Sequence, residues 1–163
     1  MDELKTKRDG MSEIVKTVCL WVESFIFLFG IYIVFFGHLT PGGGFAGGVI
    51  IAGGFILIML SFGRERVETF LPHRRITLLE STGAILFVLG SLLGLFWGDK
   101  FFTNLIQKKF GSLEFKLLSA GQIPLYNIAI AMKVMAGIFL VFWVLSITRV
   151  VLEKNGLKMV KKK

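Results

Sequence analysis

The sequence predicts an all-α, polytopic membrane protein with four transmembrane helices and a glycine-rich break between the first and the second. Hydrophobic residues make up 54% of the 163-residue chain, which contains 17 phenylalanines. These residues gather into four long runs with few charges, and most lysines and arginines stand beside the runs. A soluble domain of this size could not cover so much apolar surface, whereas membrane-spanning helices can turn it toward lipid.

Each apolar run approaches the roughly 20 residues that a helix needs to cross a bilayer. We expect spans at residues 14–36, 45–62, 78–97 and 123–150, within one transmembrane domain over 14–150. Residues 1–13 then form a cytoplasmic N-terminal segment, and residues 151–163 form a basic cytoplasmic tail. In the external connection, residues 98–122, apolar residues at helical spacing (Phe101, Phe102, Leu105 and Ile106) indicate a short interfacial helix, and a loop packed on a partner subunit is the alternative.

The distribution of basic residues predicts the orientation of the chain. On the side of the two termini lie fourteen lysines and arginines, against four on the other side, while Lys133 lies within the fourth span. The fourteen are Lys5, Lys7, Arg8, Lys16, Arg64, Arg66, Arg74, Arg75, Arg149, Lys154, Lys158, Lys161, Lys162 and Lys163. By the positive-inside rule both termini face the cytoplasm. Because this charge borders the membrane, the net charge of +8 indicates a bilayer partner and no nucleic acid.

The break at residues 38–47 is nearly free of charge and contains three consecutive glycines. Glycine adopts backbone conformations that other residues avoid, and it lets a neighbouring backbone come close. Irregular backbone at membrane depth persists only where other protein or a water-filled cavity satisfies its polar groups. We therefore expect the break to be embedded among partner helices. The residues that we assign to this feature are Pro41, Gly42, Gly43, Gly44 and Gly47, together with Gly48 directly after it.

Small residues recur four apart in the second and third spans, a spacing that lets transmembrane helices approach closely. The glycines with this spacing are Gly43 with Gly47, Gly44 with Gly48, and Gly90 with Gly94 and Gly98. The pattern predicts tight helix contacts along both spans. Whether these contacts lie within the chain or between subunits stays open.

Three ionisable residues stand out at membrane depth, away from the ends of the predicted spans or on the third span: Glu23, Glu80 and Lys133. Such groups cost about 2.5–3.5 kcal/mol each at membrane depth, so each is a candidate for an ion or proton path. Glu23 is alternatively a neutral, hydrogen-bonded residue that fixes helix register. Lys133 is alternatively one half of a structural ion pair, and we consider Glu23 as its partner because both lie near mid-span.

Polar residues near the span ends have simpler interpretations. Glu80 with Thr77 fits a capping box in which Thr77 is the N-cap of the third span. Asn127 follows Pro124 at the external start of the fourth span and is placed for an interhelical hydrogen bond. His38, beside the glycines, is expected to cap backbone groups of the loop.

No catalytic residue, metal site or cofactor is expected on this chain. His38 and His73 fall on opposite sides of the membrane, which excludes a bis-histidine haem. Cys19 is the only cysteine, so neither a disulfide nor a cysteine-based metal cluster can form within the chain. The glycine-rich break lacks the lysine and the strand–turn–helix context of a phosphate-binding loop.

The run from Gly37 to Gly48, GHLTPGGGFAGG, resembles the signature of the MnhB family, a family of membrane subunits of Mrp-type multisubunit sodium/proton antiporters. Relatives of these subunits also occur in energy-converting hydrogenases and sulfur-reducing complexes. The four-span layout, Leu79-Glu80 opening the third span and residues 123–127 opening the fourth are similar as well, over about residues 14–150. Glu80 matches the third-span glutamate of that family. Tyr126-Asn127 with Lys133 are more similar to the versions attached to redox complexes.

The resemblance implies a small, non-catalytic subunit of a prokaryotic plasma membrane, beside other antiporter-type subunits, which helps to form an ion path and a subunit interface. One alternative is the same subunit within a redox-driven ion pump, with hydrogenase-like or iron–sulfur subunits as partners. The other is a purely structural subunit that seals a helix interface. The chain alone does not separate the first two, because all redox ligands would lie on partners.

Overall fold

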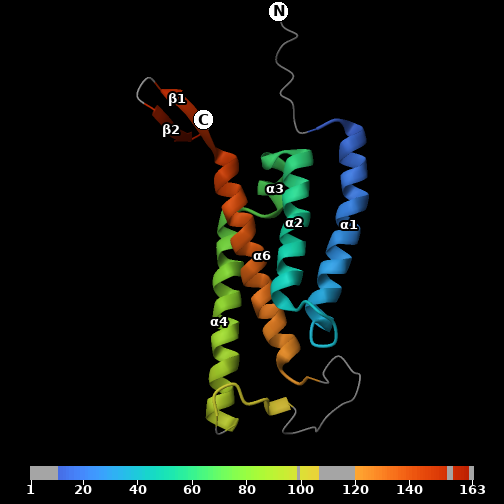
Figure 1. Ribbon diagram of the computed structural model, residues 1–163, viewed down its shortest axis with the longest axis vertical. Coiled ribbons are helices and arrows are strands. Elements are labelled where there is room, and N and C mark those ends of the chain that lie inside the picture. The colour runs from blue at the N-terminus through green and yellow to red at the C-terminus, as the bar shows by residue number, and fades with distance from the viewer. Residues whose placement is uncertain (1–10, 99, 107–119, 154–155, 162–163) are drawn as a thin grey trace, which may run out of the picture.

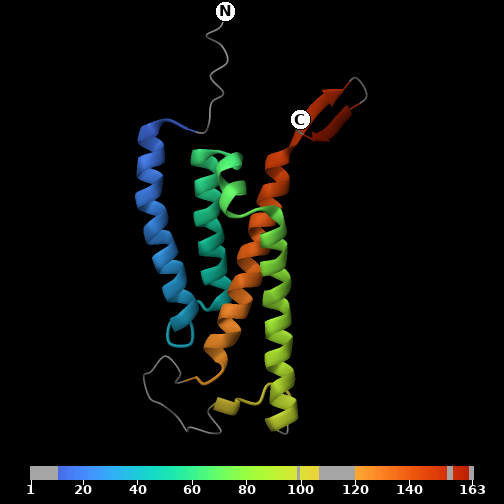
Figure 2. The ribbon, with the colours of Figure 1, turned by 180° about the vertical axis from the view of Figure 1, so that it is seen from behind.

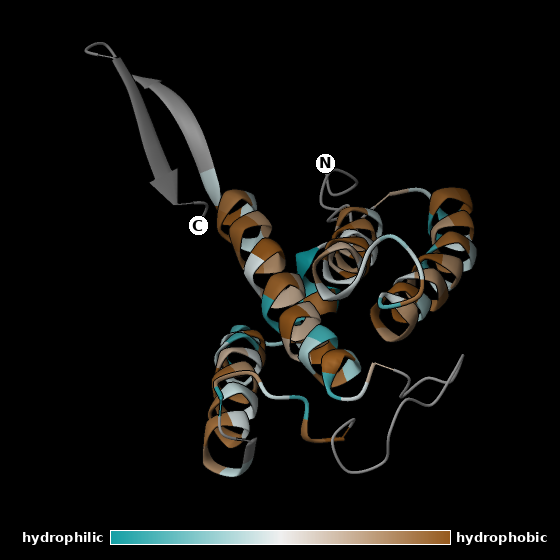
Figure 3. Cartoon of the chain, turned by 60° about the horizontal axis from the view of Figure 1, so that its bottom comes forward, coloured by the Kyte–Doolittle hydropathy of each residue, from teal (hydrophilic) through white to brown (hydrophobic). Residues whose placement is uncertain are grey.

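The computed structural model describes residues 11–98, 100–106, 120–153 and 156–161. Its main elements are four long helices: α1 (Glu13–Phe36), α2 (Gly44–Phe62), α4 (His73–Gly98) and α6 (Ile123–Ile147). All four are long and apolar enough to cross a membrane. The predicted all-helical membrane bundle of four spans is therefore confirmed, and Figure 3 shows apolar residues along all four helices.

The four helices stand side by side in the order α1, α2, α6, α4 (Figures 1 and 2). α1 begins and α6 ends at the same end of the bundle, where the short helix α3 (Arg64–Phe70) links α2 to α4. We call this the α3 end. The glycine-rich turn between α1 and α2 lies toward the opposite end.

Two helix boundaries differ from the sequence prediction. α4 begins at His73, five residues before the expected start at residue 78, because the Pro72 carbonyl accepts the first helical hydrogen bonds from Arg75 and Ile76. The charged first turn hides this extension from a hydropathy analysis. α6 ends at Ile147 where we expected residue 150, and β1 (Thr148–Glu153) pairs antiparallel with β2 (Gly156–Lys161). Part of the segment expected to be a basic tail is thus a β-hairpin (Figure 1).

α2 approaches its neighbours through glycines on two faces. A Cβ added to Gly47 would lie 2.9 Å from the Gly30 carbonyl of α1, and one added to Gly44 would lie within 2.3 Å of the Asn127 carbonyl of α6. Gly48 similarly meets the backbone of Ala131. The prediction of tight contacts along the second span is confirmed, and the seams at these positions lie within the chain.

Among the third-span glycines, Gly90 makes the predicted close helix contact, with a side chain of α6, whereas Gly94 and Gly98 do not contact another long helix in this way. Gly90 faces the ring of Tyr126, and Gly94 faces the backbone of Phe102 and Thr103 in the external connection. Gly98 is the last residue of α4. The close backbone crossing of α4 and α6 occurs instead at Gly83, where an added Cβ would lie 2.6 Å from the Ala129 carbonyl. Gly83 has no small residue four positions away, so the spacing rule missed it.

The external connection is only partly described. Phe102 has a positive φ of 62° in a turn, and its ring packs on Phe87 and Tyr126 at centroid distances of 5.7 and 5.6 Å. The expected interfacial helix therefore does not include Phe101 and Phe102, whereas Leu105 and Ile106 are helical; residues 107–119 lie outside the described part. Asn104 ties the ends of the connection together, because its side chain donates to the Ala120 carbonyl and accepts from the Gln122 amide.

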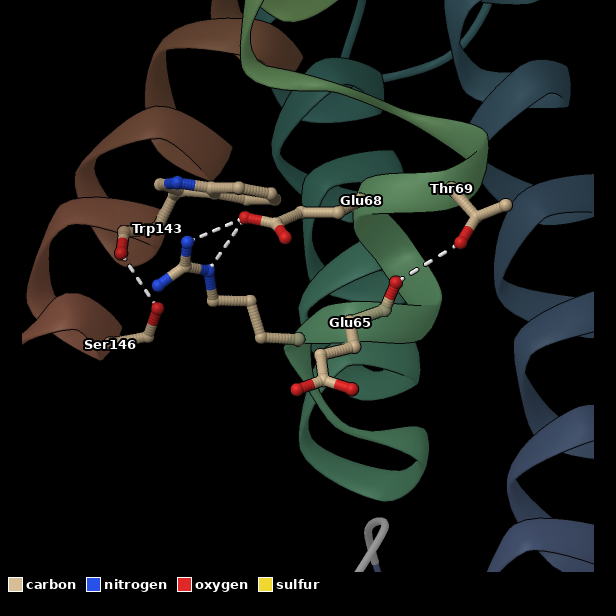
Figure 4. A network of polar contacts seen from close by, with 6 residues as sticks. Glu65, Glu68, Thr69, Trp143 and Ser146 are labelled. Carbon is tan, nitrogen blue, oxygen red and sulfur yellow. Dashed lines mark hydrogen bonds and ion pairs between the residues drawn. The ribbon is translucent and has the colours of Figure 1, made fainter. Parts of the chain in front are cut away.

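The hydrophobic core lies toward the α3 end, beneath α3. It consists of buried side chains from α2, α3, α4 and α6: Met59, Val67, Ile76, Ala136, Phe139 and Trp143. α3 is fastened to this core by Arg64, which makes a 2.6 Å ion pair with Glu68 and lies 5.3 Å from the centroid of the Trp143 ring. Figure 4 shows Glu68 of α3 and Trp143 of α6 facing this guanidinium group. The cation–π contact thus links two elements distant in sequence.

The two glycine faces of α2 lead to a prediction. Gly44→Ala should destabilise the protein by about 1–3 kcal/mol, because the new methyl group would collide with α6 backbone that cannot rotate away. The matched control is Gly53→Ala on the same helix, where an added Cβ meets nothing within 4 Å. Thermal unfolding of the detergent-solubilised protein measures both. Equal melting temperatures for the two variants would contradict this packing.

Candidate functional site

The structure joins two of the three ionisable candidates. The ammonium nitrogen of Lys133 lies 3.4 Å from Oε1 of Glu80, which links α6 to α4. α4 begins at the α3 end, and Glu80 lies about two turns from that start. α6 begins at the opposite end, and Lys133 lies about three turns from its start. Because α6 extends farther than α4 at the α3 end, these positions reach the same depth (Figure 1). The pair is therefore an interhelical contact at the depth of the apolar part of the helices.

Glycines on both helices make room for the pair. Gly83 of α4 lies against the backbone of Lys133, at 2.9 Å from an added Cβ to the amide nitrogen. Gly137 of α6 lies opposite Glu80, at 4.0 Å from an added Cβ to the carboxylate. Each charged residue thus faces a glycine of the other helix, which lets both side chains lie along the crossing.

The Glu80–Lys133 pair lies at the surface of the single chain. The side chain of Lys133 is 52% exposed and that of Glu80 is 34% exposed. Hydrocarbon cannot hydrogen-bond the remaining lone pairs and N–H groups, so a charged pair turned toward lipid is costly. The pair therefore needs water or another protein chain beside it in the membrane.

The capping-box prediction for Glu80 is wrong. The Thr77 hydroxyl donates to the His73 carbonyl, as an interior helical residue does, because the helix begins four residues earlier. Glu80 lies in the second turn, and its carboxylate reaches across to α6. The sequence does contain the capping-box pattern, but residues 73–76 are already helical, so Thr77 is not at the helix start.

Glu23 lies apart from this pair, so the hypothesis of a Glu23–Lys133 contact is wrong. It faces a cavity between α1, α2 and α3 that Arg66 also lines. Its Oε2 atom is buried and has no hydrogen-bond partner among the described residues. Phe27 and Gly30, which follow Glu23 at helical spacing on α1, contact α2.

His38 and Asn127, the polar candidates near the glycine-rich turn, each have at least one buried side-chain nitrogen without a hydrogen-bond partner among the described residues. Both ring nitrogens of His38 are buried and unpartnered within the described chain. The predicted capping is done instead by Thr40, whose amide and hydroxyl donate to the Phe36 carbonyl. Asn127 lies against the break, with its Oδ1 atom 3.4 Å from an added Cβ on Gly43, whereas its Nδ2 finds no partner in the described residues. Gly43 has φ 96°, a conformation that favours glycine.

This arrangement brings one pair of opposite charges together and leaves polar atoms of Glu23, His38 and Asn127 without a partner among the described residues. Within the described ranges, no group of three or more His, Cys, Asp or Glu residues is placed to hold a metal ion. Residues that sequence reasoning missed are Gly83, which allows the α4–α6 crossing, and Arg66, which enters the Glu23 cavity. Nothing in the sequence alone paired Arg66 of α3 with α1.

A family model described as a domain related to the MnhB subunit of Na+/H+ antiporters matches residues 14–140. The chain belongs to the MnhB family. The resemblance seen in the glycine-rich signature is therefore confirmed over most of the chain.

Individual relatives agree with this assignment. An uncharacterized protein of Methanocaldococcus jannaschii is 35% identical over 86% of this chain and 55% of its own length. A Staphylococcus aureus protein whose name assigns it as antiporter subunit mnhB2 is 35% identical over 56% of this chain and 64% of its own. The chain thus spans little more than half the length of these curated relatives.

A solved structure is similar as well. It is a chain of the membrane-bound sulfane sulfur reductase, an archaeal respiratory membrane complex, with a TM-score of 0.66 and 35% identity. The match covers 82% of this MnhB-family chain and 56% of that chain.

The Glu80–Lys133 contact predicts energetic coupling. Glu80→Gln and Lys133→Met should each destabilise the protein, and the double variant should lose less than the sum, with a coupling of about 0.5–3 kcal/mol. Glu23→Gln combined with Lys133→Met should be additive, because these residues are apart. A double-mutant cycle by thermal unfolding measures both. Additivity in the first cycle or coupling in the second would contradict the assignment.

Proposed function

We propose that this chain is a non-catalytic membrane subunit of a multisubunit sodium/proton antiporter module, in which it helps to form the ion path and a subunit interface. The single observation that carries this proposal is the Glu80–Lys133 pair at the surface of a chain of the MnhB family. A charged pair within an apolar bundle is stable only against water or another chain. An ion path bordered by a neighbouring subunit supplies both.

The orientation that we propose has the α3 end in the cytoplasm. Arg64, Arg66, Arg74 and Arg75 all lie at that end, and the positive-inside rule then applies to the folded bundle. Both chain termini follow to the same side. The partners are other antiporter-type membrane subunits, and this chain needs no cofactor of its own.

A second candidate function is the same role within a redox-driven ion pump. It is favoured by the similarity to a chain of the sulfane sulfur reductase complex, which covers more of this chain than the match to the Staphylococcus aureus relative does. In that case the redox groups and the iron–sulfur or hydrogenase-like subunits lie on partner chains. The Glu80–Lys133 pair would serve the ion path in either complex.

Gentle purification of a tagged chain from its native membrane tests the proposed assembly. Antiporter-type subunits alone among the co-purifying proteins would support the antiporter module. The same subunits together with iron–sulfur redox proteins would support the second candidate. Recovery of this chain by itself from intact membranes would overturn both.

A transport measurement tests the role of the pair. In vesicles that contain the assembled complex, Glu80→Gln and Lys133→Met should each lower sodium-dependent proton exchange severalfold, because each leaves its partner unpaired in the ion path. The control is Glu13→Gln, since Glu13 lies exposed at the start of α1 and pairs with Lys16. Unchanged exchange in both pair variants, with assembly lost in Gly44→Ala, would instead support a purely structural sealing subunit.

A further inference from the structure

A cavity of about 300 Å³ lies between α1, α2 and α3, on the far side of α2 from the Glu80–Lys133 pair. α1 and α2 touch at Gly30 and Gly47 toward the glycine-rich turn, and the cavity lies on the α3 side of that contact. Most of its wall is apolar and comes from side chains such as Ile58, Phe62 and Phe70. Its two ionisable residues are Glu23 of α1 and Arg66 of α3.

Glu23 is the cavity residue whose buried polar atom lacks a partner among the described residues. Its Oε2 atom is buried and lacks a protein partner in the described chain, and a carboxylate oxygen against apolar walls carries a desolvation cost. One water molecule occupies about 30 Å³, so the cavity has room for several. Water inside the cavity can hydrogen-bond the orphaned oxygen and connect it to the bulk.

Arg66, the second ionisable group of the cavity, belongs to α3 and so lies at the α3 end of the bundle. Arg66 is exposed, and its guanidinium group lies 5.9 Å from the ring centroids of both Phe62 and Phe70. Within the described residues it makes no ion pair with Glu23, so the carboxylate is not held by a fixed counter-charge. The other charged groups nearby are already engaged: Lys16 pairs with Glu13 on α1, and Arg64 pairs with Glu68 on α3.

We propose that this cavity is a water-filled proton-exchange site open to the cytoplasm, with Glu23 as the group that takes up and returns the proton. A hydronium ion in the cavity gives its proton to the carboxylate, an O–H bond forms at Glu23, and water remains. The reverse step returns the proton to cavity water. A lone carboxylate supplies too few oxygen atoms to replace the shell of a metal cation, which favours the proton as the ligand.

This inference rests on the proposed function for its role in ion transport and for the cytoplasmic side. The geometry of the cavity stands independently of both. It also separates two polar features that the sequence grouped together, because Glu23 and the Glu80–Lys133 pair lie on different sides of α2.

Thiol labelling in native membranes tests whether the cavity holds water. In a Cys19→Ser background, Ile58→Cys places a thiol on the cavity wall, and Trp21→Cys places one on the outward face of α1, where the side chain is 71% exposed in the single chain. Thiols react as thiolates, which form in water and not in hydrocarbon. A membrane-impermeant thiol reagent should therefore label Ile58→Cys severalfold faster than Trp21→Cys, and faster from the cytoplasmic side.

Labelling is scored only in variants that still assemble with the same co-purifying subunits. Absence of labelling at Ile58→Cys, equal labelling of both cysteines, or faster labelling from the external side would overturn the proposal. None of these readouts requires transport activity. The labelling can therefore contradict the water-filled cavity while the proposed subunit role stands, and loss of the subunit role would leave the labelling result valid.

Carboxyl modification tests the proton itself. Dicyclohexylcarbodiimide reacts with protonated carboxyl groups in apolar surroundings, so modification of Glu23 in the intact complex should increase as the cytoplasmic pH falls. Peptide mass spectrometry identifies the site, with Glu23→Gln as the blank and the water-exposed Glu13 as the internal control. Modification of Glu23 that does not change with pH, or no modification of it at all, would overturn the exchange role.

Discussion

The close approach of helix backbones at glycine positions is the constraint on which the rest of this structure depends. Lipid is as apolar as the side chains it surrounds, so burial of apolar surface gives membrane helices little reason to associate. Gly44 and Gly48 bring α2 against α6, Gly47 brings it against Gly30 of α1, and Gly83 brings α4 against α6. These crossings fix the order of the helices and therefore which polar residues meet.

The polar features follow from that order. The α4–α6 crossing at Gly83 places Lys133 beside Glu80, and the pair then faces away from the bundle. The α1–α2 contact lies on the side of the glycine-rich turn, and the cavity with Glu23 lies on the other side of it. α3 closes that end of the bundle, held to α6 by Arg64 and Trp143. One chain thus presents an ion pair on one flank and, on the other, a largely apolar cavity that contains Glu23 and Arg66.

Both features suit a subunit that works within a larger assembly. The Glu80–Lys133 pair is incomplete without a neighbouring chain or water, and the MnhB family is related to a subunit of Na+/H+ antiporters. The flanking helices α1 and α4 turn large apolar side chains outward along much of their length, among them Trp21, Phe25, Leu89 and Phe96. Lipid or partner helices can cover these side chains, whereas only a polar neighbour can satisfy the ion pair.

The sequence by itself determined the four spans, the glycine seam along the second span and the family, because hydropathy, residue spacing and the glycine-rich signature are local properties. Only the tertiary structure decided that Lys133 meets Glu80 and not Glu23, since pairing depends on which helices are neighbours and how far each is shifted along its axis. It also decided that Arg66 shares a cavity with Glu23, because α3 folds back over α2. Depth along separate helices is not encoded in spacing along one of them, and so the sequence found the charged residues but not their partners.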